Sequence, residues 1–579
     1  MRQSHKQSFL RGAMILTAAT MVVKVIGMLY KIPLGNILGA GGMSYFMSAY
    51  SIFNPMYALS VSGFPVAVSK MVSENLAAGR WRDMRRIRRV SMALFMGIGL
   101  AGSLIMLLGA TRFAGLIGNP GAAAAIGAIA PAIFFCCIIS SFRGYHQGLQ
   151  NMAPTAVSQV VESLAKLVFG IGLAAWVMNR GLSGYAQTGM VFGREADSLE
   201  QARQLVLPFA AAGAVLGVTA STAVGALYLF LCQLMKGDGI TKADIKAAPA
   251  PEGTGAIVRG LFQIALPVCL AAAVGHVSAL IDVATIMNRV GAAMTRDAGT
   301  VLAGYAGLLP SGLGMEDVPS YLYGAFSFNS SLFNLVPSLT VALGISVLPT
   351  LSTDWALGRR GQCEERIRSM LKLAALVAVP AGLGLSALAR PILELLYPAR
   401  MAEAAIAAGP LRLMGIGAVL VGITTPMMSV FQAVGRTGTP VRLMLCGAAL
   451  KAGSNYLLLA VPAWNIGAAP VGTILCYGFI LAAGLSILKG RLGVELRIGG
   501  TLIKPLICGI ICGVAANTSY NLLIRIWDSR LITLAAIIIA GGIYGVFILF
   551  LKIITKNEAL MLPNGKKIAK ILEKFGFLG

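Results

Sequence analysis

The sequence predicts an all-α polytopic membrane protein, and three observations lead to that fold class. Of its 579 residues, 57% are hydrophobic and only 12% are charged, against roughly 45–50% and about 25% in soluble domains. The mean hydropathy is +0.79. Apolar runs of about 20 residues, the length that crosses a bilayer, recur along the whole chain. These features exclude a soluble enzyme, a fibrous protein and a disordered chain.

About fourteen apolar segments are expected to form transmembrane helices. The N-terminal segment has the basic-then-apolar pattern of a signal peptide, but Lys24 and Lys31 interrupt it and no convincing cleavage site follows, so we interpret it as an uncleaved first helix. The expected spans are 10–33, 45–68, 90–111, 121–142, 154–178, 204–235, 258–288, 320–350, 369–389, 403–432, 439–460, 465–488, 499–521 and 531–554.

The distribution of basic residues sets the expected orientation. An even number of spans places both termini on one side, and if that side is the cytoplasm, the inside segments carry about three times as many Lys and Arg as the outside loops, as the positive-inside rule requires. The densest basic segment is GRWRDMRRIRR at residues 79–89, which we interpret as a topogenic cluster. The net charge of +25 is spread over many short loops, so no nucleic-acid partner is predicted.

Two internal similarities predict a duplication. VSENLAAGRWRDMRRIRR, after the second span, is echoed by LSTDWALGRRGQCEERIR after the eighth, and Gly79 matches Gly358. YHQGLQNMAPTAVSQVVESLAKL resembles SVFQAVGRTGTPVRLMLCGAALKA, and Pro154 matches Pro440 at nearly the same separation. A duplicated unit of six helices gives two pseudo-symmetric lobes of the same topology around a central cavity, the usual architecture of alternating-access transporters. The last two spans have no counterpart and are expected to be an addition.

This pattern divides the chain into five parts. They are an N-terminal lobe at 1–236, a cytoplasmic linker at 237–257, a C-terminal lobe at 258–490, the two extra helices at 491–554, and a basic amphipathic cytoplasmic tail at 555–579.

Ionisable side chains within the first lobe are candidate substrate contacts, because charge inside a bilayer is costly and faces a cavity or a partner. Lys24 and Lys31 lie seven residues apart on one helical face, and each either faces the cavity or snorkels to the interface. Glu162 and Lys166 stand at i,i+4, where they either neutralise each other or bind substrate. Arg143 lies in the predicted cytoplasmic turn RGYHQG, where it either caps a helix end or contacts substrate.

The second lobe contains another set of polar candidates. Asp282, in the seventh span, requires a cation or hydrogen-bond donors nearby. Lys451 and Asn455 stand at i,i+4 in the eleventh span, and Thr473 lies in the twelfth. The nine cysteines show no metal-ligand spacing and most lie inside apolar runs, so neither a metal nor a cofactor is predicted.

The balance of these charges favours an anionic substrate such as a phosphate or diphosphate headgroup. A cation channel or a proton-driven exporter of cationic drugs would need several carboxylates within the membrane. A membrane enzyme of lipid-linked sugar metabolism would need clustered Asp, Glu or His near the interface, often with a metal, whereas this chain has three scattered histidines. We therefore expect a transporter and not an enzyme.

The C-terminal sequence NGKKIAKILEKFGF places its apolar residues on one helical face and its lysines around them. It predicts an amphipathic helix on anionic lipids of the cytoplasmic leaflet; the alternative is a solvated tail.

Several stretches resemble the stage V sporulation protein B-like polysaccharide transporters of the multidrug/oligosaccharidyl-lipid/polysaccharide (MOP) flippase superfamily, to which MurJ-type lipid II flippases are related. They are VIGMLYKIPLGNILGAGG, SGFPVAVSKMVSE, SFRGYHQGLQNMAPTAVSQVVE, NLVPSLTVALGISVLPTLS and VFQAVGRTGTPV…GAALKAGSNYLLL. The resemblance extends over the first twelve predicted spans.

The resemblance implies a flippase that moves an undecaprenyl-linked saccharide, either a peptidoglycan precursor such as lipid II or a polysaccharide repeat unit, to the outer leaflet of the bacterial cytoplasmic membrane. Proteins of envelope synthesis are then expected as partners, in sporulation, growth or capsule synthesis. The alternative within the superfamily is a multidrug exporter. In MurJ-type flippases, cavity arginines hold the diphosphate, and Lys24 and Lys31 lie at or near two such positions. The arginine that those flippases carry in the eighth span is missing, since 320–350 contains no cation.

Some members of the superfamily bind sodium, and the matching positions here are Asp282, Lys451, Asn455 and Thr473. Lys451 departs from that pattern, because its ammonium would occupy the place of the cation. The resemblance therefore implies either an ion-coupling site or an internal Asp282–Lys451 ion pair.

Overall fold

The computed structural model describes residues 9–237, 240–495, 499–527, 529–553, 555, 558, 570 and 573. Within them, twelve helical runs are long and apolar enough to cross a membrane, which confirms an all-α, multi-pass membrane protein. Most of the expected tail at 555–579 lies outside the described residues. The chain forms two compact units, one of residues 1–288 and 310–324, the other of residues 289–309 and 325–579.

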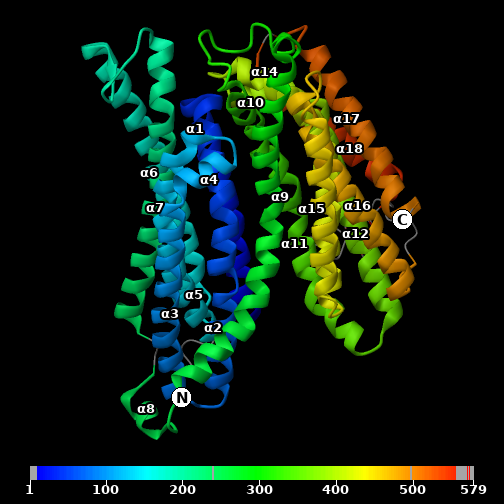
Figure 1. The fold of residues 1–579 in the computed structure, drawn as a ribbon. Coiled ribbons are helices and arrows are strands. Elements are labelled where there is room, and N and C mark those ends of the chain that lie inside the picture. The colour runs from blue at the N-terminus through cyan, green and yellow to red at the C-terminus, as the bar shows by residue number, and fades with distance from the viewer. Residues whose placement is uncertain are drawn as a thin grey trace. The chain divides into compact units, whose positions relative to one another are not determined.

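The first unit is built from long helices and one small hairpin (Figure 1). Its elements are α1 (Phe9–Tyr57), the π-helical η1 (Ala58–Ser62), α2 (Phe64–Ala77), α3 (Trp81–Leu108), α4 (Ala110–Leu116), the 3-10 helix η2 (Pro120–Ala122), α5 (Ala123–Gly148), α6 (Ala153–Thr188), β1 (Met190–Val191), β2 (Arg194–Glu195), α7 (Leu199–Lys236), α8 (Lys242–Ala247) and the first part of α9 (Thr254–Ala303). Most of α10 (Val318–Ser327) also belongs to this unit.

The second unit contains the rest of α9 and α10 together with the remaining helices. They are α11 (Asn329–Ala356), α12 (Arg360–Ala387), α13 (Ala389–Leu396), α14 (Met401–Ala433), α15 (Gly438–Leu458), the 3-10 helix η3 (Asn465–Ala468), α16 (Ala469–Leu492), the π-helical η4 (Gly499–Ile503), α17 (Lys504–Leu523) and α18 (Ile532–Phe550). The two helices expected to be an addition are α17 and α18; α17 packs on α12, and α18 packs on α17.

The predicted count of fourteen spans is not confirmed. The first two expected spans lie in one continuous helical run, Ala18–Ala77. Its longest helix, α1, is kinked at Gly39, where φ is +61° and ψ is −170°. Helix α15, which contains Arg442 and Lys451, is not among the twelve candidate spans. The lobe boundaries predicted from the duplication stay a prediction.

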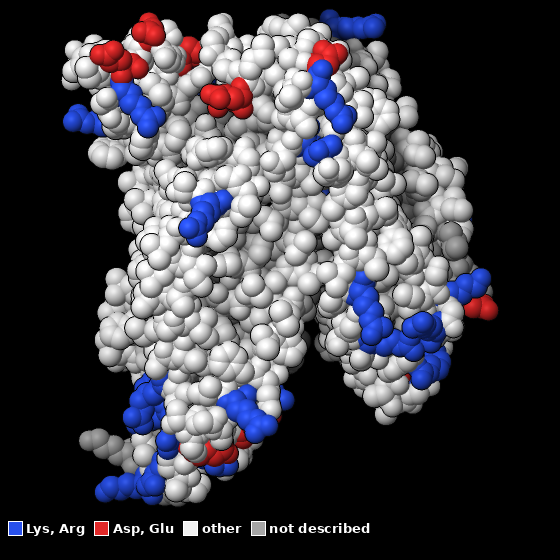
Figure 2. All heavy atoms as spheres, viewed as in Figure 1, with Lys and Arg blue, Asp and Glu red and all other residues white. Residues whose placement is uncertain are grey.

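The distribution of charge over the surface fits a membrane-crossing fold. On the face that Figure 2 shows, Lys, Arg, Asp and Glu gather near the ends of the helices of each unit, and the surface between those ends is almost entirely uncharged. Lipid tails offer ionised side chains no compensating hydrogen bonds, so the charged ends are suited to the two membrane surfaces.

The duplication seen in the sequence has a local counterpart in the structure. Gly79 and Gly358 end equivalent helices with left-handed backbone angles, φ +68° and +71°. In each turn, the backbone N–H after the glycine donates to the carbonyl oxygen of a residue in the preceding helix, Asn75 in one and Asp354 in the other, at 2.9 Å both times. A Cβ is strained at such angles, which explains why both copies place glycine there.

Helix packing repeats in the same way. In the first unit α5 contacts α2, α3 and α7, and α6 packs along α7; in the second unit α14 contacts α11, α12 and α16, and α15 packs along α16. The order of the helices along the chain is the same in both sets. Two copies of one helical arrangement are the outcome that the paired sequence segments predicted.

Close helix contacts in the first unit depend on small residues. Gly217 of α7 lies against the backbone of Gly170 in α6, and Gly170 also contacts the ring of Tyr30 in α1. The Tyr30 side chain is fully buried and its hydroxyl donates to the carbonyl oxygen of Ala214 at 3.2 Å. Helices without a side chain at the crossing approach closely, which is how membrane helices gain packing energy.

Gly217→Ala is expected to destabilise the first unit, because the added Cβ would overlap the backbone of Gly170. Overpacking of this kind costs about 1–3 kcal/mol. Thermal unfolding of the purified protein in detergent measures the effect as a lowered midpoint. Gly172→Ala is the matched control, since no heavy atom lies within 4 Å of a Cβ built there. Equal midpoints for the two variants would contradict the packing argument.

Candidate functional site

Four of the charged residues predicted in the first lobe are Lys31 on α1, Arg143 on α5, and Glu162 and Lys166 on α6; we call them the charged cluster. All four belong to the first compact unit. Both α5 and α6 contact α1, and they also contact each other. Each member of the charged cluster is only partly exposed, so the surrounding helices cover part of each charged side chain.

The strongest contact in the charged cluster is an ion pair. An Arg143 guanidinium nitrogen donates to Glu162 Oε2 at 2.9 Å, and Arg143 Nε donates to Ser158 Oγ at 3.0 Å. The exposed fractions of the two charged side chains are 15% and 26%. Since Ser158 is itself buried, the guanidinium is fixed at two points by residues one turn apart on α6. An ion pair held by additional hydrogen bonds is better compensated for its loss of water than an isolated one.

The structure corrects the predicted position of Arg143. The segment RGYHQG is helical and forms the end of α5, which continues to Gly148. The turn comes later, at Gln150, where φ is +60°. The predicted span stopped at residue 142, whereas the helix continues and its Gly144 and Gly148 allow close packing on α2, where a Cβ would meet Pro65 and Val72.

Lys166 and Lys31 supply further positive charge. Glu162 forms its ion pair with Arg143 rather than with Lys166, and the Lys166 ammonium lies over the ring of Tyr30, with Nζ 5.5 Å from its centre. Lys31 and Lys166 are close enough to repel each other. The charged cluster contains three cations and one carboxylate, so it has a net positive charge that a bound anion would relieve.

Lys24 lies nearer the start of α1 than the charged cluster does. Its side chain is exposed on the first unit, as are the neighbouring Met21, Val22 and Val25. The structure therefore places Lys24 on an apolar surface, with Lys31 seven residues further along the same helix. A contact of Lys24 with substrate stays a prediction.

The remaining predicted residues lie in two different units. Asp282 belongs to the first unit, where its charge acts on Tyr323, whose hydroxyl is hydrogen-bonded to Ser51. Lys451 and Asn455 of α15 and Thr473 of α16 are buried in the second unit. The Asn455 side chain of α15 lies against Gly472 of α16, which is the residue before Thr473 in the sequence. The Asp282–Lys451 pair stays a prediction.

The described part of the chain contains no group of three His, Cys, Asp or Glu side chains that could hold a metal ion. Two residues of the site were not predicted from the sequence. They are Tyr30, whose ring lies under the Lys166 ammonium, and Ser158, whose hydroxyl accepts a hydrogen bond from Arg143. Ser158 lies four residues before Glu162, one helical turn away, and this spacing is the sequence signal from which a shared role could have been predicted.

Comparison with known proteins defines the class of the fold. The structure matches a multidrug resistance MATE family transporter of the MOP superfamily in an inward-facing conformation, with a TM-score of 0.58, 13% identity, and coverage of 82% of this chain and 99% of that one. It matches the lipid II flippase MurJ in an inward closed conformation with a TM-score of 0.64, 13% identity, and coverage of 93% and 98%. The fold is therefore that of the MOP superfamily transporters.

Sequence comparison points to particular relatives. A family model described as polysaccharide biosynthesis protein matches residues 9–191, and one described as lipid II flippase MurJ matches residues 325–556. Stage V sporulation protein B of Bacillus subtilis is 24% identical, with 96% of this chain and 98% of the relative covered. The lipid II flippase MurJ of the same organism is 23% identical, with 93% and 94% covered. The resemblance inferred from the sequence motifs is confirmed.

Glu162→Gln is expected to destabilise the protein, because it leaves the partly buried Arg143 guanidinium without its counter-charge. A lost hydrogen bond to a charged group costs about 1.5–3 kcal/mol, and thermal unfolding in detergent measures it. Glu74→Gln is the matched control. Glu74 pairs with Lys70 at 3.9 Å, but both side chains are more than half exposed, and such pairs contribute about 0–1 kcal/mol. Equal losses in the two variants would contradict a structural role for the buried pair.

Proposed function

We propose that this protein is an alternating-access flippase for an undecaprenyl-linked saccharide, which it moves from the inner to the outer leaflet of the bacterial cytoplasmic membrane. Both termini are then cytoplasmic, and the protein acts as a transporter without enzymatic turnover. The cargo is a peptidoglycan precursor such as lipid II or a polysaccharide repeat unit.

The observation that carries this proposal is the net positive charge of the charged cluster. An undecaprenyl-linked saccharide of this kind has a diphosphate between its lipid and its sugar. Lys and Arg bind such a group through charge-assisted hydrogen bonds, which are stronger than neutral ones. Lys31 and Lys166, whose ammonium groups repel each other, are the members of the cluster that a diphosphate would bridge.

The relatives support the same class of cargo. The full length of the chain is similar to a protein named as a lipid II flippase and to a sporulation protein, and its fold matches MurJ. The match to a multidrug transporter leaves an exporter as the second candidate. Binding of cationic drugs would need a surplus of carboxylates, whereas the charged cluster contains three cations and Glu162. The charge of the site therefore favours the saccharide carrier.

Translocation of undecaprenyl-diphosphate-linked saccharides, lipid II among them, is expected in proteoliposomes that contain the wild-type protein. Lys24→Ala and Lys31→Ala are each expected to lower the initial rate about tenfold, the effect of losing one charge-assisted hydrogen bond. Lys70→Ala is the matched control, because Lys70 is exposed and pairs with the equally exposed Glu74.

Three other outcomes would change the proposal. An unchanged rate for Lys24→Ala would remove that residue from the headgroup path and leave the function standing. A rate that is unchanged for Lys31→Ala would contradict binding by the charged cluster. Efflux of an amphiphilic drug, with no translocation of any lipid-linked sugar, would place the protein among the exporters.

A further inference from the structure

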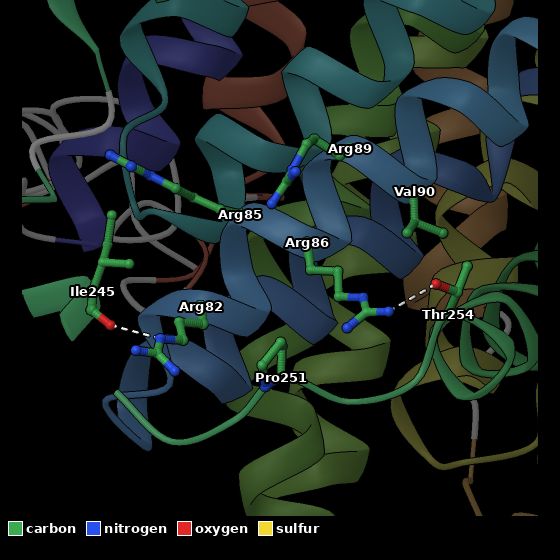
Figure 3. Close-up of a pocket in the computed structure, with 8 residues that line it drawn as sticks. All are labelled: Arg82, Arg85, Arg86, Arg89, Val90, Ile245, Pro251 and Thr254. Carbon is green, nitrogen blue, oxygen red and sulfur yellow. Dashed lines mark hydrogen bonds between the residues drawn. The ribbon is translucent and has the colours of Figure 1, made fainter. Parts of the chain in front are cut away.

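A basic pocket lies in the first unit, separate from the charged cluster. It has a volume of about 610 Å³ and is lined by residues from the start of α3 and from the linker that contains α8. Figure 3 shows four arginines on neighbouring turns of α3; Arg82 points toward Ile245 on one side, and Arg86 points toward Thr254 on the other. The lining residues are Arg82, Arg85, Arg86, Arg89, Val90, Ile245, Pro251 and Thr254.

The spacing of the arginines explains why they share the pocket. Positions 82, 85, 86 and 89 follow the i, i+3, i+4, i+7 pattern of one helical face. Arg88 lies off this face and instead stacks over the ring of Tyr145, with its guanidinium carbon 5.3 Å from the ring centre. The remaining four side chains all line the pocket, so four like charges border the same space.

Most of the arginines on this face are held by neutral groups. Arg82 Nε donates to the carbonyl oxygen of Ile245 at 2.7 Å, and Arg86 donates to the hydroxyl of Thr254 at 3.1 Å (Figure 3). Arg85 donates to the carbonyl oxygen of Ile240 at 3.1 Å. The bonds to Ile245 and Thr254 orient the guanidinium groups of Arg82 and Arg86 without neutralising their charge.

The carboxylates nearest the pocket are already used by a different arginine. Asp83 and Glu252 both pair with Arg80, at 2.8 and 3.1 Å. In the part of the chain that the structure describes, no carboxylate forms an ion pair with Arg82, Arg86 or Arg89. Within the described residues, these three charges therefore have no carboxylate that compensates them.

The second copy of the duplicated segment provides an internal comparison. There Arg366, which matches Arg86, pairs with Asp354 at 2.7 Å, and Arg368 pairs with Glu364 at 3.3 Å. The second copy thus neutralises these two cations with its own carboxylates.

The two copies also differ in the number of arginines on this face. The residues at the positions of Arg82, Arg85 and Arg89 in the second copy are Gln362, Glu365 and Ser369. Positive charge that only sets orientation in the membrane needs no particular face. The first copy instead concentrates its extra arginines in a pocket, so orientation alone does not explain their arrangement.

We propose that this pocket binds the phosphate group of an anionic lipid headgroup at the cytoplasmic surface of the membrane. Arginine presents a planar fork of donors that matches phosphate oxygens, and basic pockets between membrane helices are suited to such headgroups. The volume lies within the range of small-molecule sites. Val90 lines the pocket beside Arg89 and begins the apolar part of α3, which places the site at headgroup depth. The inner-leaflet location depends on the orientation given with the proposed function.

A bound phosphate would also connect parts of the chain that are distant in sequence. Arg82 and Arg85 already donate to carbonyl oxygens of the linker, and Thr254 is the first residue of α9. A phosphate group held among the four arginines joins α3 to the segment between α7 and α9. Anionic lipid would therefore stabilise the first unit.

The test measures lipid binding to the purified, delipidated full-length protein, so it is independent of any transport activity. Cardiolipin and phosphatidylglycerol are expected to bind and to raise the unfolding temperature, whereas phosphatidylcholine is not. Arg86→Gln/Arg89→Gln is expected to weaken this binding about tenfold or more, since each basic residue near an anionic headgroup contributes about a factor of five. Arg86→Lys/Arg89→Lys, which keeps the charge, should recover part of it.

The matched control is Arg112→Gln/Arg180→Gln, which removes two exposed arginines of the same unit and should leave binding unchanged. Equal losses in the pocket and control variants would overturn the proposal. Undecaprenyl phosphate and inorganic pyrophosphate distinguish the source of the phosphate. Preference for undecaprenyl phosphate supports a lipid-phosphate site and assigns it to the cargo lipid. Pyrophosphate binding as tightly as the lipids would overturn the lipid assignment.

A second measurement uses only the wild-type protein, in case the variants insert wrongly. Phenylglyoxal modifies accessible arginines, and peptide mass spectrometry reports the extent at each position. Cardiolipin is expected to protect residues 82–89 more than Arg112 and Arg180. Equal modification with and without cardiolipin would contradict binding in the pocket.

Discussion

Compensation of charge in an apolar environment is the constraint on which this structure depends. A lone ionised side chain within a bilayer costs several kcal/mol, so each one requires a partner, a hydrogen-bond donor or water. The ion pair between Arg143 and Glu162, reinforced by Ser158, satisfies that requirement for two charges and ties α5 to α6. Glu162 carries a single negative charge, so it does not balance Lys31 and Lys166 in addition to Arg143. The fold therefore tolerates an excess of cations where a transported anion would supply the balance.

The two basic sites of the first unit hold their cations in different ways. The charged cluster lies among the faces of α1, α5 and α6, whereas the basic pocket lies where α3 meets the linker. In the cluster, the positive side chains stand beside an aromatic ring and one carboxylate; in the pocket, neutral carbonyl oxygens hold them. Lys166 over the Tyr30 ring, and Arg82 and Arg86 on their neutral acceptors, are oriented without being neutralised. The proposals assign the first arrangement to a cargo that is released and the second to a lipid that stays bound.

Much of the fold could be predicted from the sequence, because hydropathy and helix length are local properties. The duplication was also visible, since Gly79 and Gly358 need the same backbone angles. The site was harder to predict. Arg143 was placed in a turn because the apolar span was expected to end at residue 142, yet the helix continues and Gly144 and Gly148 pack on α2. The partner of Glu162 is a residue on another helix and not the neighbour at i+4, and a sequence pattern carries no information on such a contact. The basic segment at 79–89 was recognised only as a signal for orientation, because its pocket needs the linker to close it.

The glycine turn shared by the two copies separates what backbone geometry fixes from what side chains are free to vary. Both copies retain the left-handed residue and the hydrogen bond that closes the turn, while the helix that follows is strongly basic in the first copy and balanced in charge in the second. The turn is thus a module whose conformation is independent of the residues after it. Exchange of residues 81–89 for 361–369 would transplant the balanced surface of one copy onto the backbone of the other. After duplication, new specificity could therefore arise in this chain by changes in surface charge, with no change in helix packing.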